Sequence, residues 1–366
     1  MHHVCHLSSV HPTKDVRIFH KECASLAAHG YRVTLIVPGE MDHQDKGVDI
    51  RVIPRARSRS ERLLRSARLV LRRALETDAD LYHFHDPELF PIGLFLKAKG
   101  KRVIFDSHED LPRQILSKPW IPSALRRPVS GVTELIENFA AKRLDAVVTA
   151  TPFIRDRFAA LGVRAEAINN YPMLEELDLG QTDWTGKKRQ AIYIGGITAI
   201  RGAREMLQAI QSTDTNLLLA GPIEATLTEE LEAAAKGAQI ELAGVLDRPQ
   251  VVVALRESMV GLCVLHPTIN YLDSTPIKLF EYMAAGLPVI ASDFPRWREL
   301  VGDSGAAIFV DPKDPTAIAD AIRSLINDPT RAEQMGEAGR RRVHSGYHWG
   351  LELKKLVALY ESLLDT

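Results

Sequence analysis

Residues 273–291 read DSTPIKLFEYMAAGLPVIA, and this run predicts how the chain around it folds. A polar loop leads into a helix that we expect to begin near Pro276, with Ser274 or Thr275 as its cap. Gly286 suits the position just beyond the helix, where a left-handed backbone ends it. The apolar run that follows predicts a buried strand. A helix, a turn and a buried strand in this order are typical of a parallel sheet covered by helices.

The same pattern continues outward in both directions, because short apolar runs alternate with amphipathic stretches of helical length along the chain. In the first half we expect strands at His3–Leu7, Arg32–Val37, Asp49–Ile53, Leu81–Phe84, Arg102–Phe105 and Ala146–Thr149. In the second half we expect them at Ala191–Ile194, Asn216–Ala220, Gln239–Leu242, Val260–Val264, Pro288–Ala291 and Ala306–Val310. Two such sets predict an α/β protein with two Rossmann-like, doubly wound parallel-sheet domains.

The turn-prone segment Asn169–Pro172 interrupts this alternation and predicts a domain boundary. We therefore expect a first domain at 1–168 and a second at 169–347. An amphipathic helix at 348–366 follows, and it can pack back onto the first domain. A length of 366 residues suits two domains that each bury a core.

The composition excludes several classes of protein. The chain has 45% apolar and 25% charged residues and a net charge of −1, so it is neither disordered nor collagen-like. Its three cysteines lie far apart and form no C-x-x-C pair, which excludes a disulfide framework. No apolar stretch approaches the roughly 18–20 residues that span a bilayer. We expect a cytoplasmic protein that can associate with the inner face of a membrane.

The charge is unevenly distributed along the chain. Residues 1–168 carry 27 Lys+Arg against 20 Asp+Glu, and the remainder carries 19 against 27. Arg51–Arg73 contains nine arginines and one acid, with apolar residues between them, and Arg113–Arg127 forms a second basic group. Basic amphipathic segments can bind anionic lipid, although a solvated face has the same pattern. No nucleic-acid-binding motif accompanies the charge, so we expect no nucleic-acid partner.

A glycine-rich turn follows the expected strand Ala191–Ile194. Gly195 and Gly196 allow backbone N–H groups to approach a phosphate, and the next helix contributes partial positive charge at its N-terminus. Arg201 adds a fork of donors. The turn therefore suits a diphosphate, although an ordinary strand-to-helix turn can have a similar sequence.

Two carboxylates, one in the loop and one on the helix that begins near Pro276, can bracket one ligand. Glu281 lies eight residues beyond Asp273, and carboxylates accept hydrogen bonds from sugar hydroxyls. Lys278, in the first helical turn, adds positive charge. An ordinary solvated glutamate would fit the same helix.

Residues 274–291 resemble the C-terminal signature of the retaining glycosyltransferases of family 4, which have the two-domain GT-B fold with the domains facing across a cleft. In that family two acidic residues, separated by seven others, contact the donor sugar and the nucleotide ribose. They correspond to Asp273, where the family usually has Glu, and to Glu281. Gly196 and Arg201 stand where the family usually has Arg and Lys. The resemblance implies donor-binding residues Gly195, Gly196, Arg201, Gly244, Val245, Asp273, Ser274, Thr275, Pro276, Ile277, Lys278 and Glu281.

Histidines concentrate in the first part of the chain, where residues 1–108 contain ten of the thirteen. His108 follows a buried strand and opens a loop, and the resembling enzymes carry there a histidine that contacts the donor sugar. The resemblance implies the catalytic set His108, Asp273, Arg201 and Lys278. We expect the other histidines to be structural, and we predict no metal site where His83 and His85 flank Phe84.

The start of the chain resembles a subgroup associated with bacterial surface polysaccharides. Asp15 and Arg17 precede or open the first helix, and we expect them to face the cleft, where Asp15 orients an acceptor hydroxyl. A salt-bridged helix start fits them equally. The acceptor-side residues that we predict are Asp15, Arg17, His85 and Glu109.

These features predict a retaining glycosyltransferase that moves a hexose-type sugar from a nucleotide-diphosphate sugar, UDP-linked rather than GDP-linked, to a saccharide or lipid-linked acceptor. We expect no metal and no other cofactor. A nucleotide-sugar epimerase of the same fold and a non-catalytic nucleotide-sugar-binding scaffold are the alternatives.

Overall fold

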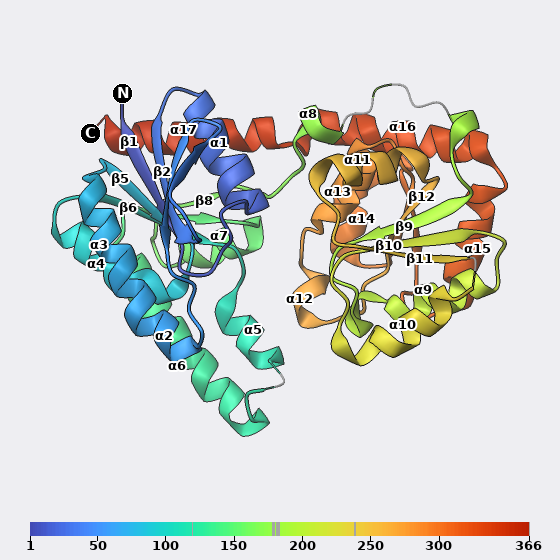
Figure 1. The fold of residues 1–366 in the computed structure, drawn as a ribbon, viewed down its shortest axis with the longest axis horizontal. Helices are drawn as coiled ribbons and strands as arrows, with labels where there is room; N and C mark the ends of the chain where they lie inside the picture. Colours follow the sequence, from blue (N-terminus) through green and yellow to red (C-terminus); the bar gives the residue numbers. More distant parts are fainter. Residues whose placement is uncertain (119, 178–179, 181–183, 238, 366) are drawn as a thin grey trace. The chain divides into compact units, whose positions relative to one another are not determined.

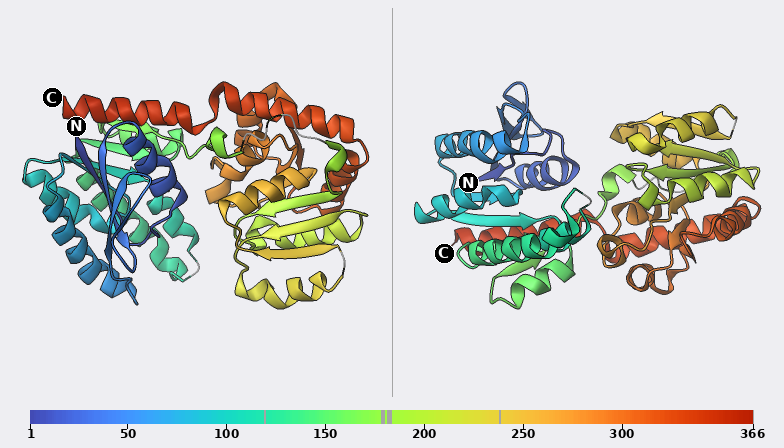
Figure 2. Two further views of the ribbon diagram at one scale, coloured as in Figure 1. Left: turned by 45° about the horizontal axis from the view of Figure 1, so that its top comes forward. Right: turned by 90° about the horizontal axis from the view of Figure 1, so that it is seen from below.

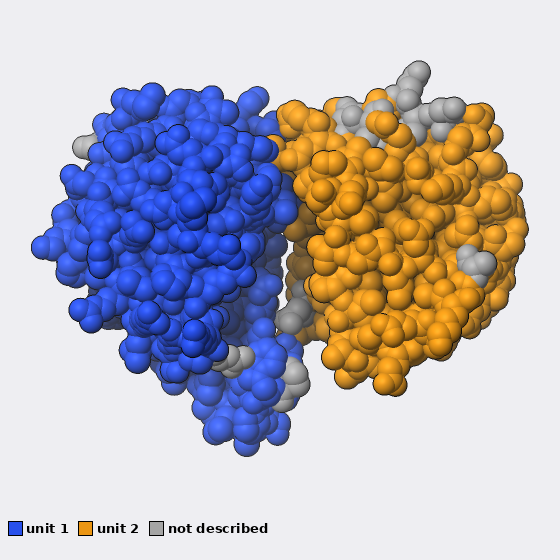
Figure 3. Space-filling model, viewed as in Figure 1, with its two compact units in different colours: residues 1–170, 349–366 blue, residues 171–348 orange. Residues whose placement is uncertain are grey.

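The computed structural model describes residues 1–118, 120–177, 180, 184–237 and 239–365, without the side chains of Arg59 and Asn270. The chain divides into two compact units, coloured separately in Figure 3. Unit 1 comprises Met1–Asn170 and Trp349–Thr366, and unit 2 comprises Tyr171–His348. The chain thus first passes from unit 1 to unit 2 after Asn170, two residues beyond the expected boundary at residue 168. The terminal helix belongs to unit 1.

Unit 1 contains an eight-stranded sheet in the order β3-β4-β2-β1-β5-β6-β7-β8 (Figure 1). All neighbouring strands are parallel except β3 and β4, which are antiparallel. The strands are β1 His3–Leu7, β2 Arg32–Pro38, β3 His43–Asp45, β4 Val48–Ile53, β5 Leu81–Phe84, β6 Arg102–Ser107, β7 Ala146–Thr149 and β8 Ala165–Ala167.

The α-helices of unit 1 lie on both faces of its sheet (Figures 1 and 2). They are α1 Ala24–Ala28, α2 Arg59–Glu61, α3 Ala67–Thr77, α4 Phe90–Ala98, α5 Leu111–Ser117, α6 Ser123–Ala141, α7 Pro152–Ala159 and α17 Trp349–Leu364. Two π-helical segments, η1 Val16–Cys23 and η2 Arg62–Ser66, lead into α1 and α3, and the short turn η3 covers Pro87–Leu89.

Unit 2 contains a six-stranded parallel sheet in the order β11-β10-β9-β12-β13-β14. Its strands are β9 Gln190–Ile194, β10 Asn216–Ala220, β11 Ile240–Gly244, β12 Val260–Cys263, β13 Val289–Ser292 and β14 Ala307–Val310. Its helices are α8 Leu174–Leu177, α9 Ala203–Gln211, α10 Thr228–Ala235, α11 Arg248–Glu257, α12 Ile269–Leu272, α13 Ile277–Ala284, α14 Pro295–Val301, α15 Pro315–Ile326 and α16 Pro329–Gly346. The short turns are η4 Trp184–Gly186, η5 Ala199–Arg201, η6 Ala225–Leu227 and η7 Gly302–Ser304.

The two sheets confirm the predicted α/β class, and each of the twelve expected strands is present within a few residues. The sequence pattern missed β3 and β8. Both are three-residue strands at the edges of the sheet, with polar or small residues and little burial, so no apolar run marks them.

The terminal helix α17 completes the core of unit 1 (Figure 2). Leu356 and Tyr360 are fully buried, and the Trp349 Nε1–H donates a hydrogen bond to Ser25 Oγ over 2.9 Å. Among the described residues, no helix is both long enough and apolar enough to cross a membrane.

Helix α13 ends as predicted, because Gly286 follows it with a φ of +72°. Helix α16 crosses this end so closely that a Cβ on Gly336 would lie 2.0 Å from the Gly286 carbonyl oxygen. Two glycines therefore set the packing distance beneath α13.

We predict that Gly336→Ala lowers the free energy of unfolding of unit 2 by about 1–3 kcal/mol, because the new methyl group collides with backbone. The matched control is Gly346→Ala in the same helix, where a Cβ would meet nothing within 4 Å. Urea denaturation should show little loss, or a small gain, for the control. Equal stability of the two variants would contradict this packing.

Candidate functional site

The strand order of unit 2 reverses between β9 and β12. The chain runs from β9 outward to β10 and β11, and then returns to β12 on the other side of β9. Ligands of open parallel sheets bind at such a switch point, beyond the carboxyl ends of the strands. The residues predicted to bind a donor follow these strands.

Glycines keep the backbone close together beyond β9. Gly195 has a φ of +133°, and a Cβ on it would lie 3.3 Å from Lys278 Nζ. A Cβ on the neighbouring Gly196 would lie 2.8 Å from an Arg201 guanidinium nitrogen. Gly221 approaches from the β10 loop, where a Cβ would lie 2.1 Å from the Gly195 carbonyl oxygen. Any larger residue at Gly195 or Gly196 would displace one of the two cations.

Arg201 and Lys278 are held beside these glycines by tyrosines. The Arg201 Nε–H donates to Tyr271 Oη over 3.2 Å, and Lys278 Nζ lies 3.4 Å from Tyr193 Oη and 4.8 Å from the centre of that ring. Burial lowers the pKa of Lys278. The structure thus brings together the two predicted cations, and it adds Tyr193 and Tyr271, which the sequence pattern did not indicate.

The start of α13 differs from the prediction in its cap. Pro276 itself occupies the N-cap position and no side chain caps the helix. Ser274 instead donates from its hydroxyl to the Tyr271 carbonyl, closing the end of α12. The first turn at Ile277 and Lys278 therefore has no side-chain acceptor at its cap. Asp273 is exposed, and Thr275 is half-buried in the same loop.

Glu281 lies on α13, where it forms an ion pair that the sequence did not reveal. Its Oε1 accepts from Arg248 at the start of α11 over 2.9 Å, and Arg248 also binds Glu176 over 2.7 Å. Arg248 fixes the Glu281 carboxylate on the side where α11 begins. Arg248 lies 33 residues from Glu281, so no local motif could signal the contact.

The predicted base-binding residues follow β11. Gly244 has a φ of +66° and Val245 is exposed. The Gly244 carbonyl accepts from the Gly221 N–H over 2.7 Å, which ties this loop to the one after β10.

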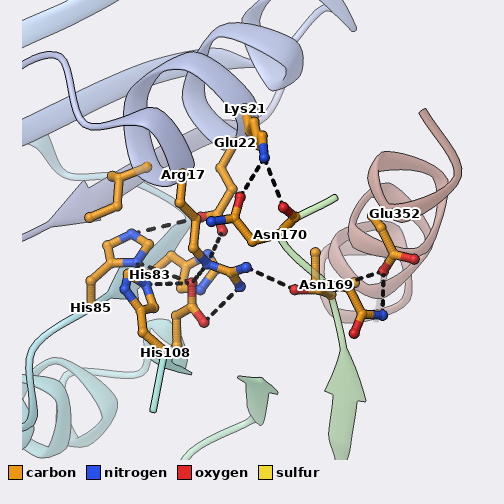
Figure 4. A network of polar contacts seen from close by, with 12 residues as sticks. Arg17, Lys21, Glu22, His83, His85, His108, Asn169, Asn170 and Glu352 are labelled. Carbon is orange, nitrogen blue, oxygen red and sulfur yellow. Dashed lines mark hydrogen bonds and ion pairs between the residues drawn. The ribbon is translucent and has the colours of Figure 1, made fainter. Parts of the chain in front are cut away.

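The polar edge of unit 1 is organised around a buried ion pair between Arg17 and Asp106 (Figure 4). The guanidinium makes two hydrogen bonds of 3.0 Å to the carboxylate and one of 2.8 Å to the Ile168 carbonyl. Burial opposes charge on Asp106, but Arg17 and His108 hold the pKa of this carboxyl well below its usual range. Sequence reasoning missed Asp106, although it precedes His108 by only two residues.

His108 and His85 both turn toward Asp106. His108 Nε2 lies 3.0 Å and His85 Nδ1 3.2 Å from Asp106 Oδ2. The His108 ring is half-buried, whereas His85 is buried and burial lowers the pKa of His85 to about 4. His85 and Arg17 therefore lie beneath the surface and support His108, so the structure does not present them to an acceptor.

Asp15 and Glu109, the other predicted acceptor-side residues, lie nearer the surface. Asp15 caps η1 by accepting from the Arg17 and Ile18 backbone N–H groups, and His11 Nδ1 lies 3.1 Å from its carboxylate. These hydrogen bonds outweigh burial and lower the pKa of Asp15. Glu109 is exposed and accepts from Gln114.

A surface pocket of about 380 Å³ lies in unit 1 beyond β1 and β2. Its lining includes Ser9, His11, Arg55 and Arg62. The His11 ring centre lies 5.3 Å from that of His108, which places the pocket next to the predicted catalytic histidine.

His83 and His85 lie two residues apart at the end of β5, so they share one face of the sheet, and their ring centres are 4.9 Å apart. Of the residues described, two groups have ligand atoms close enough to hold a metal ion. The first is His6, Glu22, His83 and His85, and the second is His85, Asp106 and His108.

The predicted basic segment is helical from residue 59 onward, through α2, η2 and α3, whereas Arg51 lies in β4. Several of its arginines are paired. Arg62 binds Glu88, Arg65 binds Glu61 and Arg73 lies 3.3 Å from Asp42. The second basic group leads into α6, which carries an exposed apolar stripe. This stripe consists of Leu125, Val129, Val132, Leu135, Ile136 and Phe139.

Two family models match the chain. The model described as "Glycosyl transferase 4-like domain" matches residues 16–170, and the model described as "Glycosyl transferases group 1" matches residues 175–342. The matched segments correspond closely to the first segment of unit 1 and to unit 2.

Similar curated proteins are named glycosyltransferases. A phosphatidyl-myo-inositol mannosyltransferase of Mycobacterium leprae is 25% identical over 81% of this chain and 77% of its own length. The D-rhamnosyltransferase WbpZ of Pseudomonas aeruginosa is 26% identical over 74% of this chain and 70% of its own.

Solved structures share the fold over nearly the whole length. A sucrose-phosphate synthase from Thermosynechococcus elongatus matches with a TM-score of 0.78 at 17% identity, and each chain is fully covered. HepE of Anabaena, solved in complex with UDP-glucose, matches with a TM-score of 0.74 at 13% identity over 99% of this chain and 100% of that one. The chain therefore belongs to the group 1 glycosyl transferases and has the GT-B fold.

Proposed function

We propose that this enzyme transfers a hexose-type sugar, with retention of configuration, from a UDP-sugar to a saccharide or lipid-linked saccharide acceptor. The observation that carries the proposal is the convergence at the switch point of unit 2. Gly195 and Gly196 leave room for an anion there, Arg201 and Lys278 supply positive charge, and Glu281 supplies a carboxylate.

The proposed chemistry is electrostatic stabilisation of a leaving diphosphate. As the bond between the sugar and the diphosphate breaks, negative charge grows on the phosphate oxygens, and Arg201, Lys278 and the first backbone N–H groups of α13 face that charge. The Lys278 ammonium is only partly satisfied by Tyr193. A bound diphosphate would therefore supply the negative charge that the neutral Tyr193 hydroxyl does not provide.

Retention is proposed on the resemblance to family 4. The acceptor oxygen bonds to the sugar on the face from which the diphosphate departs, and the departing phosphate oxygen takes the acceptor proton. This step balances without an enzyme nucleophile, and we propose that it uses no metal cofactor.

The remaining donor contacts follow from chemistry and position. Glu281, oriented by Arg248, accepts hydrogen bonds from ribose hydroxyls, and Gly244 and Val245 contact the base through their main chain. Asp273, Ser274, Thr275, Pro276 and Ile277 form the loop and helix start that face the sugar and the diphosphate. The UDP-glucose bound to the similar protein HepE favours a UDP-linked donor.

We propose that the acceptor binds unit 1 in the pocket beside His11 and His108. Arg55 and Arg62 line this pocket and favour an acceptor with an anionic group, such as a diphosphate-linked lipid. His108 contacts the transferred sugar, and Asp106, Arg17 and His85 position it. Asp15 and Glu109 lie close enough to the surface to bind acceptor hydroxyls.

We also propose that unit 1 associates with the surface of an anionic membrane. The apolar stripe of α6 is exposed, and Lys118, Trp120, Arg126 and Arg127 precede or begin the helix. Apolar side chains flanked by basic residues suit the boundary between headgroups and acyl chains.

The function is tested by incubating the purified protein with a panel of UDP- and GDP-sugars and following sugar release. We expect slow hydrolysis of one UDP-sugar, because transferases commonly transfer to water in the absence of acceptor. His108→Ala should slow this release about a hundredfold and leave UDP affinity unchanged, whereas His29→Ala, at an exposed histidine, should not slow it. Full release by His108→Ala would remove His108 from the proposed role.

Donor contacts are tested by calorimetry with UDP. Glu281→Ala should weaken binding about 10–100-fold, because a charge-assisted hydrogen bond to the ribose is lost. Glu176→Ala removes the other carboxylate that binds Arg248 and should change affinity by less than about threefold. Unchanged affinity in Glu281→Ala would refute the ribose contact.

The same calorimetry tests the contact between Arg201 and the diphosphate. Arg201→Ala should weaken UDP binding at least about tenfold. The control Arg204→Ala, which removes a side chain that binds Glu230, should not.

Membrane association is tested by co-sedimentation with phosphatidylglycerol-containing vesicles, with phosphatidylcholine vesicles as the control. Neutralising Arg126 and Arg127 to Gln should weaken binding about thirtyfold, since each basic residue near such a surface contributes about 1 kcal/mol. Leu135→Gln with Ile136→Gln should weaken it further than Val253→Gln, which changes an exposed residue of unit 2. Binding that survives both double substitutions would exclude α6 as the contact.

A further inference from the structure

Unit 1 contains a buried cluster of histidines that the transfer reaction does not use. His6 on β1, His83 on β5, His85 just beyond β5 and Glu22 on η1 meet where the strand order of the sheet reverses. The histidines are at most 3% exposed and Glu22 is fully buried. Figure 4 shows His83, His85 and Glu22 close to Arg17, on the side of the network away from Glu352.

The donor atoms of this cluster have the spacing of metal ligands. One atom from each of the four residues lies within 4.8 Å of one atom from every other. His6 Nδ1 is 3.0 Å from His85 Nε2 and 3.7 Å from Glu22 Oε2, and His85 Nε2 is 3.9 Å from that oxygen. A zinc ion about 2.1 Å from each of four ligands holds them roughly 3.4 Å apart, so small adjustments would complete a tetrahedron.

The opposite nitrogen of each ring already has a partner. His85 Nδ1 lies 3.2 Å from Asp106, and Tyr360 Oη lies 2.7 Å from His83 Nδ1 and 3.1 Å from His6 Nε2. A hydroxyl oxygen has two lone pairs and can accept from both rings. Histidines that bind zinc have this outer contact, which leaves the inner nitrogen unprotonated.

Buried atoms without hydrogen bonds mark the centre of the cluster. Among the described residues, His83 Nε2 and both carboxylate oxygens of Glu22 have no hydrogen-bond partner, although Glu22 Oε1 lies 3.1 Å from Arg17 Nε. Neutral imidazoles are the form that binds metal, and a dication would satisfy the carboxylate.

We propose that His6, Glu22, His83 and His85 bind one zinc ion. Four protein ligands leave no open position, so the ion is structural: it joins the first strand, the first helical segment and β5. The proposal is independent of the transfer reaction, and it adds a metal to unit 1 where the sequence predicted none.

The alternative arrangement is a chain of hydrogen bonds without metal. It would run from His83 through Tyr360, His6 and His85 to Asp106, and every link has a suitable distance. This chain leaves His83 Nε2 and Glu22 Oε2 without a hydrogen bond, while Glu22 Oε1 is paired with Arg17. The second group of possible ligands, His85, Asp106 and His108, differs because its atoms already contact one another within 3.2 Å.

The test is the zinc content of the full chain, purified without chelator, dialysed against zinc and then freed of excess metal. We expect about one zinc per chain by elemental analysis. Glu22→Gln keeps the shape of the side chain but removes the charge, and it should contain less than about a tenth of that amount. The matched control is His3→Gln. His3 is a buried histidine on β1, the strand that carries His6, but its ring contacts Thr34 and not the cluster, so this variant should retain the zinc.

Thermal unfolding provides a second readout that does not depend on activity. A strong chelator should lower the melting temperature of the wild-type chain by about 5–10 °C and leave Glu22→Gln unaffected. A wild-type chain without zinc, or Glu22→Gln with wild-type zinc content, would overturn the proposal in favour of the metal-free hydrogen-bond chain. Both measurements are made without a donor sugar, so their results do not depend on the outcome of the donor-binding and hydrolysis tests.

Discussion

The ion pair between Arg17 and Asp106 is the contact on which the polar edge of unit 1 depends. A guanidinium stays charged at any ordinary pH, so its burial requires carboxylates and carbonyls that satisfy its donors. Arg17 thereby fixes η1, the end of β6 and the chain at Ile168 in one arrangement. Removing either partner would leave an uncompensated buried charge, which costs about 3–5 kcal/mol. The ion pair also positions His108, because the His108 ring contacts the Asp106 carboxylate.

The cations of the two units have different kinds of partner. In unit 1 the buried cation is satisfied by the protein, and the excess positive charge lies in surface segments such as α3 and the start of α6. In unit 2, which is acidic overall, Arg201 and Lys278 contact tyrosines and a carbonyl rather than carboxylates. A cation without a carboxylate partner attracts an anionic ligand most strongly. The uneven charge of the sequence therefore corresponds to surface cations in unit 1 and, in unit 2, to two cations that contact tyrosines and a carbonyl.

The elements of the fold were predictable because apolar runs and glycines act locally. The twelve expected strands and the left-handed Gly286 follow from such signals, whereas the short edge strands β3 and β8 have none. The positions of Gly195 after β9 and of Lys278 on α13 were predictable because apolar runs and a helical pattern mark these elements. Their partners were not: Arg248 binds Glu281, and Tyr360 contacts His6 across 354 residues of sequence. The cap of α13 was misjudged because Ser274 closes the preceding helix instead.

The return of α17 to unit 1 imposes an order on the synthesis of the protein. The ribosome makes the first 170 residues of unit 1, then all of unit 2, and only then the helix that carries Leu356 and Tyr360 into the core of unit 1. Until that helix emerges, the core of unit 1 lacks Leu356 and Tyr360, and His6 and His83 lack their hydroxyl partner. Unit 2 is contiguous and can fold as soon as it is complete. The unit that begins the chain is therefore the last to finish folding, and its core stays incomplete for the longest time.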